Sequence, residues 1–381
     1  MEFRDLKRQY KNLQHELAPA IRQVLYDGAF IGGEPVDKLE ASLAEYVGVK
    51  HCITCANGTD ALVMSLRACG VGVGDAVFVP DFTFVAPAEA VALLGATPIF
   101  VDVDEATFNL SPQSLERALE EVIAAGRLVP RALIAVDLFG LPADYPALCA
   151  IAKRYDLLLL EDGAQGFGGM IGAQRACSFG DLATTSFFPA KPLGCYGDGG
   201  AIFTDNDEWA AEIRSLKVHG KGADKYDNVR IGYNSRLDTI QAAVLDIKLA
   251  AFDGSELGAV QCSAAQYSAA LSDLPHLHTP TIPDGYASSW AQYTLRFDTS
   301  EQRDALRQAL AEASVPTMAY YPAPLSSQPA YRLFAEDYTP SIIAPRLCQT
   351  ILQLPIHPYL TEKEMSLVIR TIRTALAIRR D

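Results

Sequence analysis

A chain of 381 residues, 49% hydrophobic and 20% charged, is long enough to bury a sizeable core in one large and one small domain. Its net charge of −14 argues against a nucleic-acid partner, because phosphate backbones are bound by clustered Lys and Arg side chains. No apolar run approaches the ~20 residues of a membrane span, and residues 1–7 are too charged for a signal peptide. We therefore expect a cytoplasmic protein that makes no membrane contact and keeps its eight cysteines reduced.

The first fifty residues are predicted to be helical. Apolar residues recur at spacings of three and four in two stripes, residues 6–24 and 36–47, which is the period of an amphipathic helix. Pro19 falls inside the first stripe, where it can kink or split the helix.

Residues 51–205 alternate between short strands and helices. The β-rich runs are 52–55, 77–80, 97–101, 133–136 and 157–160, and the helical stretches between them are 59–69, 87–94, 112–123 and 145–155. This alternation predicts βαβ units and a mostly parallel, doubly wound sheet, in which ligands gather at the carboxyl ends of the strands. Cys52 and Cys55 lie on one predicted strand, where residues three apart face opposite sides, so we expect two packed thiols and no metal site.

Three loops at predicted strand ends carry groups that can bind a flat, phosphorylated ligand. The first runs through Gly58 into a helix whose free amides can bind phosphate; a plain capped turn is the alternative. The second holds Phe84, whose ring can stack on a cofactor or pack into the core. The third ends an apolar strand at Asp162, which can pair with a protonated pyridine nitrogen or cap a helix.

Residues 184–200 contain one lysine, Lys191, in an apolar run that is preceded by hydroxyl residues and followed by four glycines. An apolar pocket disfavours the ammonium form and lowers the pKa of the amine, which can then form a Schiff base with a carbonyl. The glycines allow the backbone to pass close to a ligand. Taken alone, this stretch could also be a surface lysine beside a Gly-rich turn.

A phosphate loop, an aromatic residue, a strand-end Asp, and a Ser and a Lys before a Gly-rich stretch follow one another in the order typical of fold-type I pyridoxal phosphate enzymes. The chain resembles the nucleotide-sugar aminotransferases of the DegT/DnrJ/StrS type essentially from end to end. The residues that carry this resemblance are 57–62, 161–165, 186–194, 232–238, 241–243 and 321–322. The resemblance implies an α/β, aspartate aminotransferase-like fold: a mostly parallel sheet between helices in a large domain, residues 1–250, and a smaller α+β domain, residues 251–381.

The resemblance also implies how pyridoxal phosphate would be held. Lys191 would form the Schiff base with the cofactor, and Asp162 would pair with its pyridine nitrogen. Gln165 would contact the side of the ring that bears the hydroxyl, and Phe84 would stack on the ring face.

By the same resemblance, the phosphate would be held by Ser186 and by the backbone amides of Gly58 and Thr59. Asn234 would reach the phosphate in the partner subunit, so that the active sites of a homodimer are shared. Arg236 would contact an anionic group of the substrate, also across that interface.

The implied reaction moves the amino group of L-glutamate to a keto group of a nucleotide-linked sugar with ping-pong kinetics. Lys191 favours amination, because the dehydratase branch of the family has His at this position. The stretches 185–203, 234–238 and 354–359 are most similar to members that aminate UDP-2-acetamido-2-deoxy-3-oxo-D-glucuronate for surface polysaccharides. The alternatives are another UDP- or dTDP-linked 3-keto or 4-keto sugar, a sulfur-transferring or decarboxylating relative, and a non-catalytic, cofactor-binding regulator of the same fold.

Two departures from the family pattern concern the site itself. The chain has Tyr320-Tyr321-Pro322 where the family usually has His-Tyr-Pro, and that His typically lies near the sugar. We therefore expect Tyr320 and Tyr321 on the substrate side. Gly163 and Gly166 replace the more usual Ala and Ser beside Asp162 and Gln165.

The rest of the chain is less regular. Residues 221–230 are polar and contain glycine, which favours an active-site loop. Thr361 and Glu364 form a capping box, and His357 is expected to be packed or in a loop rather than catalytic. The helices predicted by spacing are 236–251, 259–274, 300–313 and 361–377.

Overall fold

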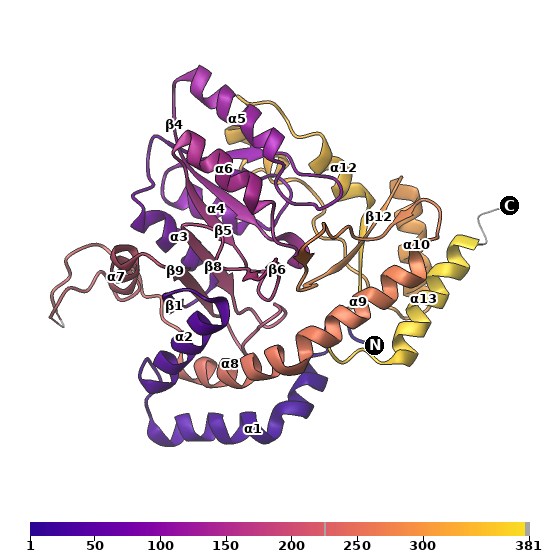
Figure 1. Ribbon diagram of the computed structural model, residues 1–381, viewed down its shortest axis with the longest axis horizontal. Helices are drawn as coiled ribbons and strands as arrows, with labels where there is room; N and C mark the ends of the chain where they lie inside the picture. The colour runs from indigo at the N-terminus through magenta and orange to yellow at the C-terminus, as the bar shows by residue number, and fades with distance from the viewer. Residues whose placement is uncertain (225, 378–381) are drawn as a thin grey trace.

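The centre of the molecule is a seven-stranded sheet with the order β1-β9-β8-β5-β4-β2-β3. Figure 1 shows this sheet in the computed structural model, which describes residues 1–224 and 226–377. β9 runs antiparallel to both of its neighbours, and the other neighbours are parallel, so the predicted mostly parallel sheet is confirmed. The strands are β1 His51–Cys55, β2 Asp75–Pro80, β3 Thr97–Val101, β4 Val129–Val136, β5 Leu158–Asp162, β8 Leu182–Ser186 and β9 Gly200–Thr204.

The five strands predicted from the sequence are all present, with ends shifted by at most a few residues. The sequence pattern does not predict β8 and β9. β8 contains Thr184 and Thr185 and β9 contains Ile202 and Phe203, which favour strands, but no helix separates the two, so they do not fit the alternation of strands and helices from which the other strands are predicted. Both are nonetheless flanked by strands on each side, and this pairing stabilises them.

Alternate residues of the strands face opposite layers of helices. In β4, Ile134 packs in the cluster that includes α3, α4 and α7, while Leu133 packs with α5 and α6. Cys55 lies in the first of these clusters, whereas Cys52 lies on the other face under α2 and α8, as predicted for the C-x-x-C. The flanking helices are α2 Glu34–Val47, α3 Gly58–Ala68, α4 Ala86–Leu93, α5 Pro112–Ala125, α6 Tyr145–Tyr155, α7 Asp207–Leu216 and α8 Thr239–Ala251.

The N-terminal helix α1, Leu6–Asp27, lies alongside α8 (Figure 1). Pro19 is exposed and does not split α1, because the carbonyl that its missing N–H leaves free can be hydrated there. The segment before α1 runs back towards the C-terminal part of the chain, where Met1 packs against the apolar cluster around Val260 and Met365. Residues 1–5 therefore pack against the C-terminal part of the chain, with Asp5 buried and Glu2 exposed.

A long helical run links the two parts of the chain. α8 continues through a π-helical turn, η2 Phe252–Glu256, into α9, Leu257–Leu271, so that the run spans Thr239–Leu271. It leads to a three-stranded antiparallel sheet, β10-β12-β13, covered by α9, α10 and α13. The predicted helix at 236–251 begins three residues later than expected, and the capping box of Thr361 and Glu364 is present. The division at residue 250, which falls inside this helical run, stays a prediction.

The remaining elements are short or belong to the C-terminal part. A second small sheet has the order β11-β6-β7, in which β6 pairs with both of the other strands. These elements are β6 Met170–Ile171, β7 Gln174–Arg175, β10 Leu277–His278, β11 Tyr286–Ala287, β12 Tyr293–Phe297, β13 Ile351–Leu354, η1 Leu138–Gly140, η3 Leu325–Ser327, α10 Ser300–Glu312, α11 Arg332–Ala335, α12 Ile343–Thr350 and α13 Glu362–Ala377.

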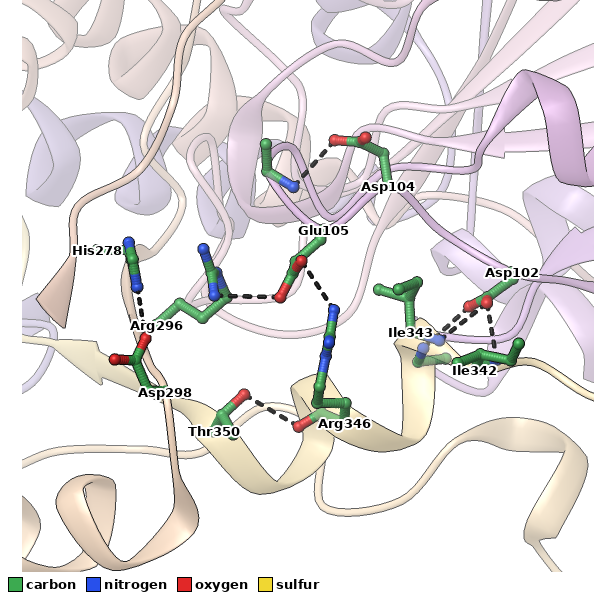
Figure 2. A network of polar contacts seen from close by, with 12 residues as sticks. Asp102, Asp104, Glu105, His278, Arg296, Asp298, Ile342, Ile343, Arg346 and Thr350 are labelled. Atoms are coloured by element: carbon green, nitrogen blue, oxygen red, sulfur yellow. Dashed lines mark hydrogen bonds and ion pairs between the residues drawn. The ribbon is translucent and has the colours of Figure 1, made fainter. Parts of the chain in front are cut away.

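A polar contact also joins the loop after β3 to the C-terminal part (Figure 2). The Asp102 carboxylate accepts hydrogen bonds from the backbone N–H groups of Ile342 and Ile343 at 2.7 and 2.8 Å, at the start of α12. Glu105 forms ion pairs with Arg296 at 3.1 Å and with Arg346 at 2.8 Å. This contact, the Asp102–Glu105 network, fixes α12 and β12 against the edge of the central sheet.

Among residues 1–224 and 226–377, no helix combines the length and the apolar character that crossing a membrane requires. All eight cysteines fall within these ranges and carry free thiols.

Candidate active site

Asp162 and Lys191 come together because two neighbouring parallel strands end at the same edge of the sheet. Asp162 is the last residue of β5 and pairs in register with Thr184 of β8, whose chain continues into the loop that carries Lys191. Asp162 is buried, with 6% of its surface exposed, and Lys191 is partly buried. The exposed-lysine alternative is therefore wrong.

The electrostatics of this pair are those of two buried groups of opposite charge. Burial raises the pKa of the Asp162 carboxyl, while a hydrogen bond from the Ala164 N–H and the charge of Lys191 counteract the rise. Burial lowers the pKa of the Lys191 amine, Asp162 opposes this, and Arg4 lowers it further. A larger fraction of Lys191 is thus uncharged near neutral pH than of an exposed lysine. No helix follows Asp162, so the helix-cap alternative is also wrong.

Gln165, Tyr321 and Phe84 line one side of this edge. The Gln165 carboxamide accepts a hydrogen bond from the Phe139 N–H at 3.0 Å and donates one to the Tyr321 hydroxyl at 3.3 Å. The Tyr321 ring lies 6.2 Å from that of Phe84, which is 51% exposed. Phe84 is therefore not a core residue, and the core position in its loop is taken by the buried Phe82.

The predicted phosphate loop lies against the end of β8. A Cβ atom at Gly58 would lie 2.8 Å from the Cβ of Ser186, so only glycine allows the two segments to approach this closely. The Asn57 side chain accepts a hydrogen bond from the Asp60 N–H, which caps α3. The amides of Gly58 and Thr59, in the first turn of α3, have no intrahelical acceptor and can still bind an anion. The capped turn and the anion site are thus compatible.

A buried pair of carboxyl groups lies beneath this edge. Burial raises the pKa of Asp137 well above its usual value and that of Glu161 to about 7; each carboxyl also lies within hydrogen-bond reach of the other. Glu161 accepts from the backbone N–H groups of Cys177 and, at 2.8 Å, of Phe179. Near neutral pH the pair therefore holds a proton between the two groups.

Asp137 and Cys177 explain why the chain has glycine at positions 166 and 163, where the family usually has other residues. A Cβ atom at Gly166 would overlap the Asp137 carboxylate, and one at Gly163 would lie 2.5 Å from the Cys177 sulfur. Both positions are glycine because neighbouring side chains fill the space that a Cβ atom needs.

Asn234 and Arg236 contact each other through their side chains. Arg236 donates a hydrogen bond to the Asn234 side chain at 2.6 Å, and Asn234 is exposed. Between them, Ser235 is buried and accepts a hydrogen bond from the Ala56 N–H, so the segment is anchored near the phosphate loop of its own chain. Of the predicted loop 221–230, Lys225 lies outside the described residues.

The sequence pattern does not point to the N-terminal pentapeptide as part of the site. The Phe3 ring packs edge-on against Tyr320, with the ring centres 6.5 Å apart. Arg4 donates hydrogen bonds to the backbone carbonyls of Lys191 and Pro192. Because 187 positions separate Arg4 from Lys191, local spacing could not reveal this contact.

A family model described as the DegT/DnrJ/EryC1/StrS aminotransferase family matches residues 11–373. The chain belongs to this family. The UDP-2-acetamido-2-deoxy-3-oxo-D-glucuronate aminotransferase of Pseudomonas aeruginosa is 44% identical to it over 97% of this chain and 98% of that protein. A pleiotropic regulatory protein of Geobacillus stearothermophilus is 40% identical over 97% of this chain and 96% of that one. The crystal structure of a DegT/DnrJ/EryC1/StrS aminotransferase from Brucella abortus matches with a TM-score of 0.95 and 47% identity, covering 99% of each chain.

As a DegT/DnrJ/EryC1/StrS aminotransferase, the protein has the fold-type I fold and is a pyridoxal phosphate-dependent transaminase of nucleotide sugars. The described residues fit this cofactor in two respects. Asp162 and Lys191 supply a buried carboxylate and an amine of lowered pKa that interact electrostatically, and these are the two groups that a protonated pyridine and an aldehyde require. The cradle between Gly58 and Ser186 is one that a Cβ atom would fill.

Proposed function

We propose that this aminotransferase moves the amino group of L-glutamate to the 3-keto group of UDP-2-acetamido-2-deoxy-3-oxo-D-glucuronate, in the cytoplasm, for surface polysaccharide synthesis. The observation that supports the sugar is the 44% identity with the Pseudomonas aeruginosa enzyme over nearly the full length of both chains. The observation that supports amino transfer is that Lys191, whose pKa burial lowers, lies within electrostatic reach of the buried Asp162.

In this proposal each residue at the edge of the sheet holds one part of pyridoxal phosphate. Lys191 binds it covalently through its amine, and Asp162 pairs with the pyridine nitrogen. Gln165 contacts the hydroxyl side of the ring and Phe84 covers one face. Ser186, with the amides of Gly58 and Thr59, binds the phosphate. When bound, the cofactor would supply the electron sink that the reaction requires.

The main chemical work of the protein is proton transfer by Lys191. Its lowered pKa would allow the freed amine to take up a proton at Nζ from the donor carbon and to deliver it to C4′ of the cofactor within the same half-reaction; the second half-reaction would run this transfer in the opposite direction. Asp162 keeps its negative charge next to the bound ring, because a cation beside a buried carboxylate favours its ionised form. The partly buried position of Lys191 limits the access of water to this step.

We further propose that the site is completed by a second copy of the chain. Asn234 is exposed and so can reach the phosphate in a partner subunit. Arg236 offers a guanidinium for bidentate pairing with a substrate carboxylate there. Tyr320 and Tyr321, beside Phe3 and Phe84, would line the sugar side.

The experiment that tests this function has two halves. The purified protein, loaded with pyridoxal phosphate, is first incubated with L-glutamate, and we expect one equivalent of 2-oxoglutarate per site together with the loss of the visible absorbance. A panel of UDP- and dTDP-linked 3-keto and 4-keto sugars then identifies the acceptor. Equal rates with all of these sugars would contradict the uronate assignment.

An Arg236→Ala variant tests whether this arginine binds the keto-sugar. We expect weaker amination of the keto-sugar and a nearly unchanged glutamate half-reaction. If both half-reactions suffer equally, Arg236 acts on the cofactor or the fold and not on the substrate.

A second candidate is a regulatory protein that binds the cofactor without turning over a donor, favoured by the 40% identity with the pleiotropic regulatory protein. The glutamate half-reaction separates the two candidates. A protein that binds pyridoxal phosphate but releases no 2-oxoglutarate would be the regulator.

A further inference from the structure

Arg4 binds the backbone of the residue that carries the candidate catalytic amine. Its Nη2 atom donates hydrogen bonds to the carbonyl oxygens of Lys191 at 2.6 Å and of Pro192 at 3.3 Å. Arg4 is partly buried, and the segment that carries it is fixed by Phe3 on Tyr320. The guanidinium therefore has a defined place beneath the Lys191 loop, which we define as residues 187–196.

The Lys191 loop has no helix or strand of its own. Its carbonyls at Phe187 and Phe188 accept hydrogen bonds within the loop, and others draw on donors from other segments. Lys248 of α8, only 2% exposed, donates to the carbonyl of Gly194. Gln241, also of α8, bonds to the N–H of Tyr196 at 2.8 Å and to its carbonyl at 3.3 Å. Arg4 supplies the corresponding donors in the middle of the loop, at Lys191 and Pro192.

The charges around Arg4 leave it ionised at neutral pH. Burial lowers the pKa of Arg4 to about 10, and the charge of Glu256 opposes that change. Lys248 lies close enough that Arg4 contributes, after burial, to the lowering of its pKa to about 8. Asp162 and Arg4 are the charged groups that act on Lys191, in opposite directions. Removing the charge of Arg4 therefore favours the ammonium form of Lys191.

We propose that Arg4 is a positioning residue for Lys191: it holds the carbonyls of residues 191 and 192 and keeps a positive charge beside the amine. The inference rests on the proposed role of Lys191 as the amine that binds the cofactor. Arg suits this task better than Lys, because its planar guanidinium offers several donors in a fixed geometry.

The test compares three variants of the full chain. Arg4→Gln removes the charge, and Arg4→Lys keeps the charge with a single ammonium group. Arg8→Gln is the matched control, since Arg8 lies four positions further on, in the first turn of α1, and binds the Tyr359 carbonyl at 2.5 Å and Glu364 at 3.0 Å. The first readout is the pH dependence of Lys191 acylation in the chain freed of cofactor, followed by peptide mass spectrometry. The second is hydrogen exchange of the peptide that contains the Lys191 loop.

In Arg4→Gln we expect the midpoint of the acylation profile to move to higher pH by about half a unit. This slows acylation about threefold at any pH below the midpoint, because one pKa unit is tenfold in the population of free amine. The Lys191 loop should also exchange faster in this variant. Arg4→Lys should keep the midpoint, and Arg8→Gln should change neither readout.

The inference is overturned if the Arg4→Gln profiles coincide with those of Arg8→Gln in a chain that melts at the wild-type temperature. A shift as large in Arg4→Lys as in Arg4→Gln would contradict the electrostatic half of it. Failure of the proposed function is distinguished from failure of this inference by a separate result. If Lys191 does not bind the cofactor, the Lys191→Ala chain will still bind pyridoxal phosphate covalently, whatever the acylation profiles of the Arg4 variants are.

Discussion

The surroundings of Lys191 and the Asp102–Glu105 network both join segments that are far apart in the sequence. They differ in how far their ionic groups are exposed to water. Around Lys191 the ionic groups are buried: Lys248 is 2% exposed and Glu256 is 5% exposed. In the Asp102–Glu105 network the side chains of Glu105 and Arg346 are 35% and 50% exposed. Water therefore screens the second set and not the first.

This difference in burial separates two kinds of ionic group. The buried groups have shifted pKa values, whereas the exposed groups only link segments of the chain. Burial lowers the pKa of Lys191, lowers that of Lys248 to about 8 and raises that of Asp162. Perturbed groups of this kind gather at functional sites, because a shifted pKa matches a side chain to a task in proton transfer. We expect substitutions near Lys191 to change chemistry and stability strongly, and those in the Asp102–Glu105 network to change stability weakly.

The largest effect is expected for Lys191→Ala. Amino transfer from glutamate should fall by ~10²–10⁴-fold or more, because both the amine that binds the cofactor and the proton carrier are lost. The measurement is 2-oxoglutarate release over time. Lys38→Ala, which removes an exposed lysine paired with Asp246, is the matched control and should retain the wild-type rate. Wild-type activity in Lys191→Ala would contradict the expectation that substitutions at the buried site change the chemistry strongly.

The next effect concerns packing below the site. Gly166→Ala should lower the free energy of unfolding by ~1–3 kcal/mol, because the added methyl group overlaps the Asp137 carboxylate. Urea denaturation measures it. Adding Asp137→Ala should recover part of the loss, since that change removes the overlapping group. Gly258→Ala is the control: nothing lies within 4 Å of its Cβ position, so it should be neutral or stabilising. Equal losses at both glycines would contradict the packing argument.

The pH dependence of the free energy of unfolding tests the effect of burial on a further group, His357, which is 2% exposed. Burial lowers its pKa from 6.5 to about 4, and the nearby charges of Asp5, Arg4, Arg8 and Glu364 partly cancel. Between pH 6.5 and 4 the unfolded chain binds a proton that the folded chain does not. The stabilising contribution is thus complete above pH 6.5 and is lost as the pH falls towards 4, by at most about 3 kcal/mol.

Urea denaturation at pH 7 and pH 4.5 measures this loss. His357→Gln should show a smaller decrease in stability over that range than the wild type. His15→Gln, which removes a histidine whose side chain is 72% exposed, serves as the control. Identical decreases in all three proteins would show that His357 is not the source.

The smallest effect is expected in the Asp102–Glu105 network. Glu105→Gln should lower the free energy of unfolding by less than about 1 kcal/mol, because its ion pairs with Arg296 and Arg346 are partly exposed. The difference from wild type should shrink further in high salt. A loss of several kcal/mol that salt does not reduce would place this network with the buried groups around Lys191.

Sequence patterns predict those parts of the molecule whose residues are close together in the chain. The alternation from His51 to residue 205 predicts the parallel sheet, and the strand that ends at Asp162 and the Gly-rich stretch after Lys191 predict the chemistry at its edge. Arg4 is not predicted, because its partner is a backbone carbonyl 187 positions away and any donor could occupy that place. Gly166 is visible as a departure, but its cause, the Asp137 side chain, emerges only from packing.

The account depends on covalent attachment of pyridoxal phosphate to Lys191. The direct test is to reduce the loaded protein with borohydride, digest it and determine by mass spectrometry which lysine carries the pyridoxyl phosphate group. We expect a stoichiometric adduct on the peptide that contains Lys191 and none on the peptide that contains Lys248, the buried lysine beneath the same loop. An adduct on Lys248 or any other lysine, with Lys191 unmodified, would contradict the account.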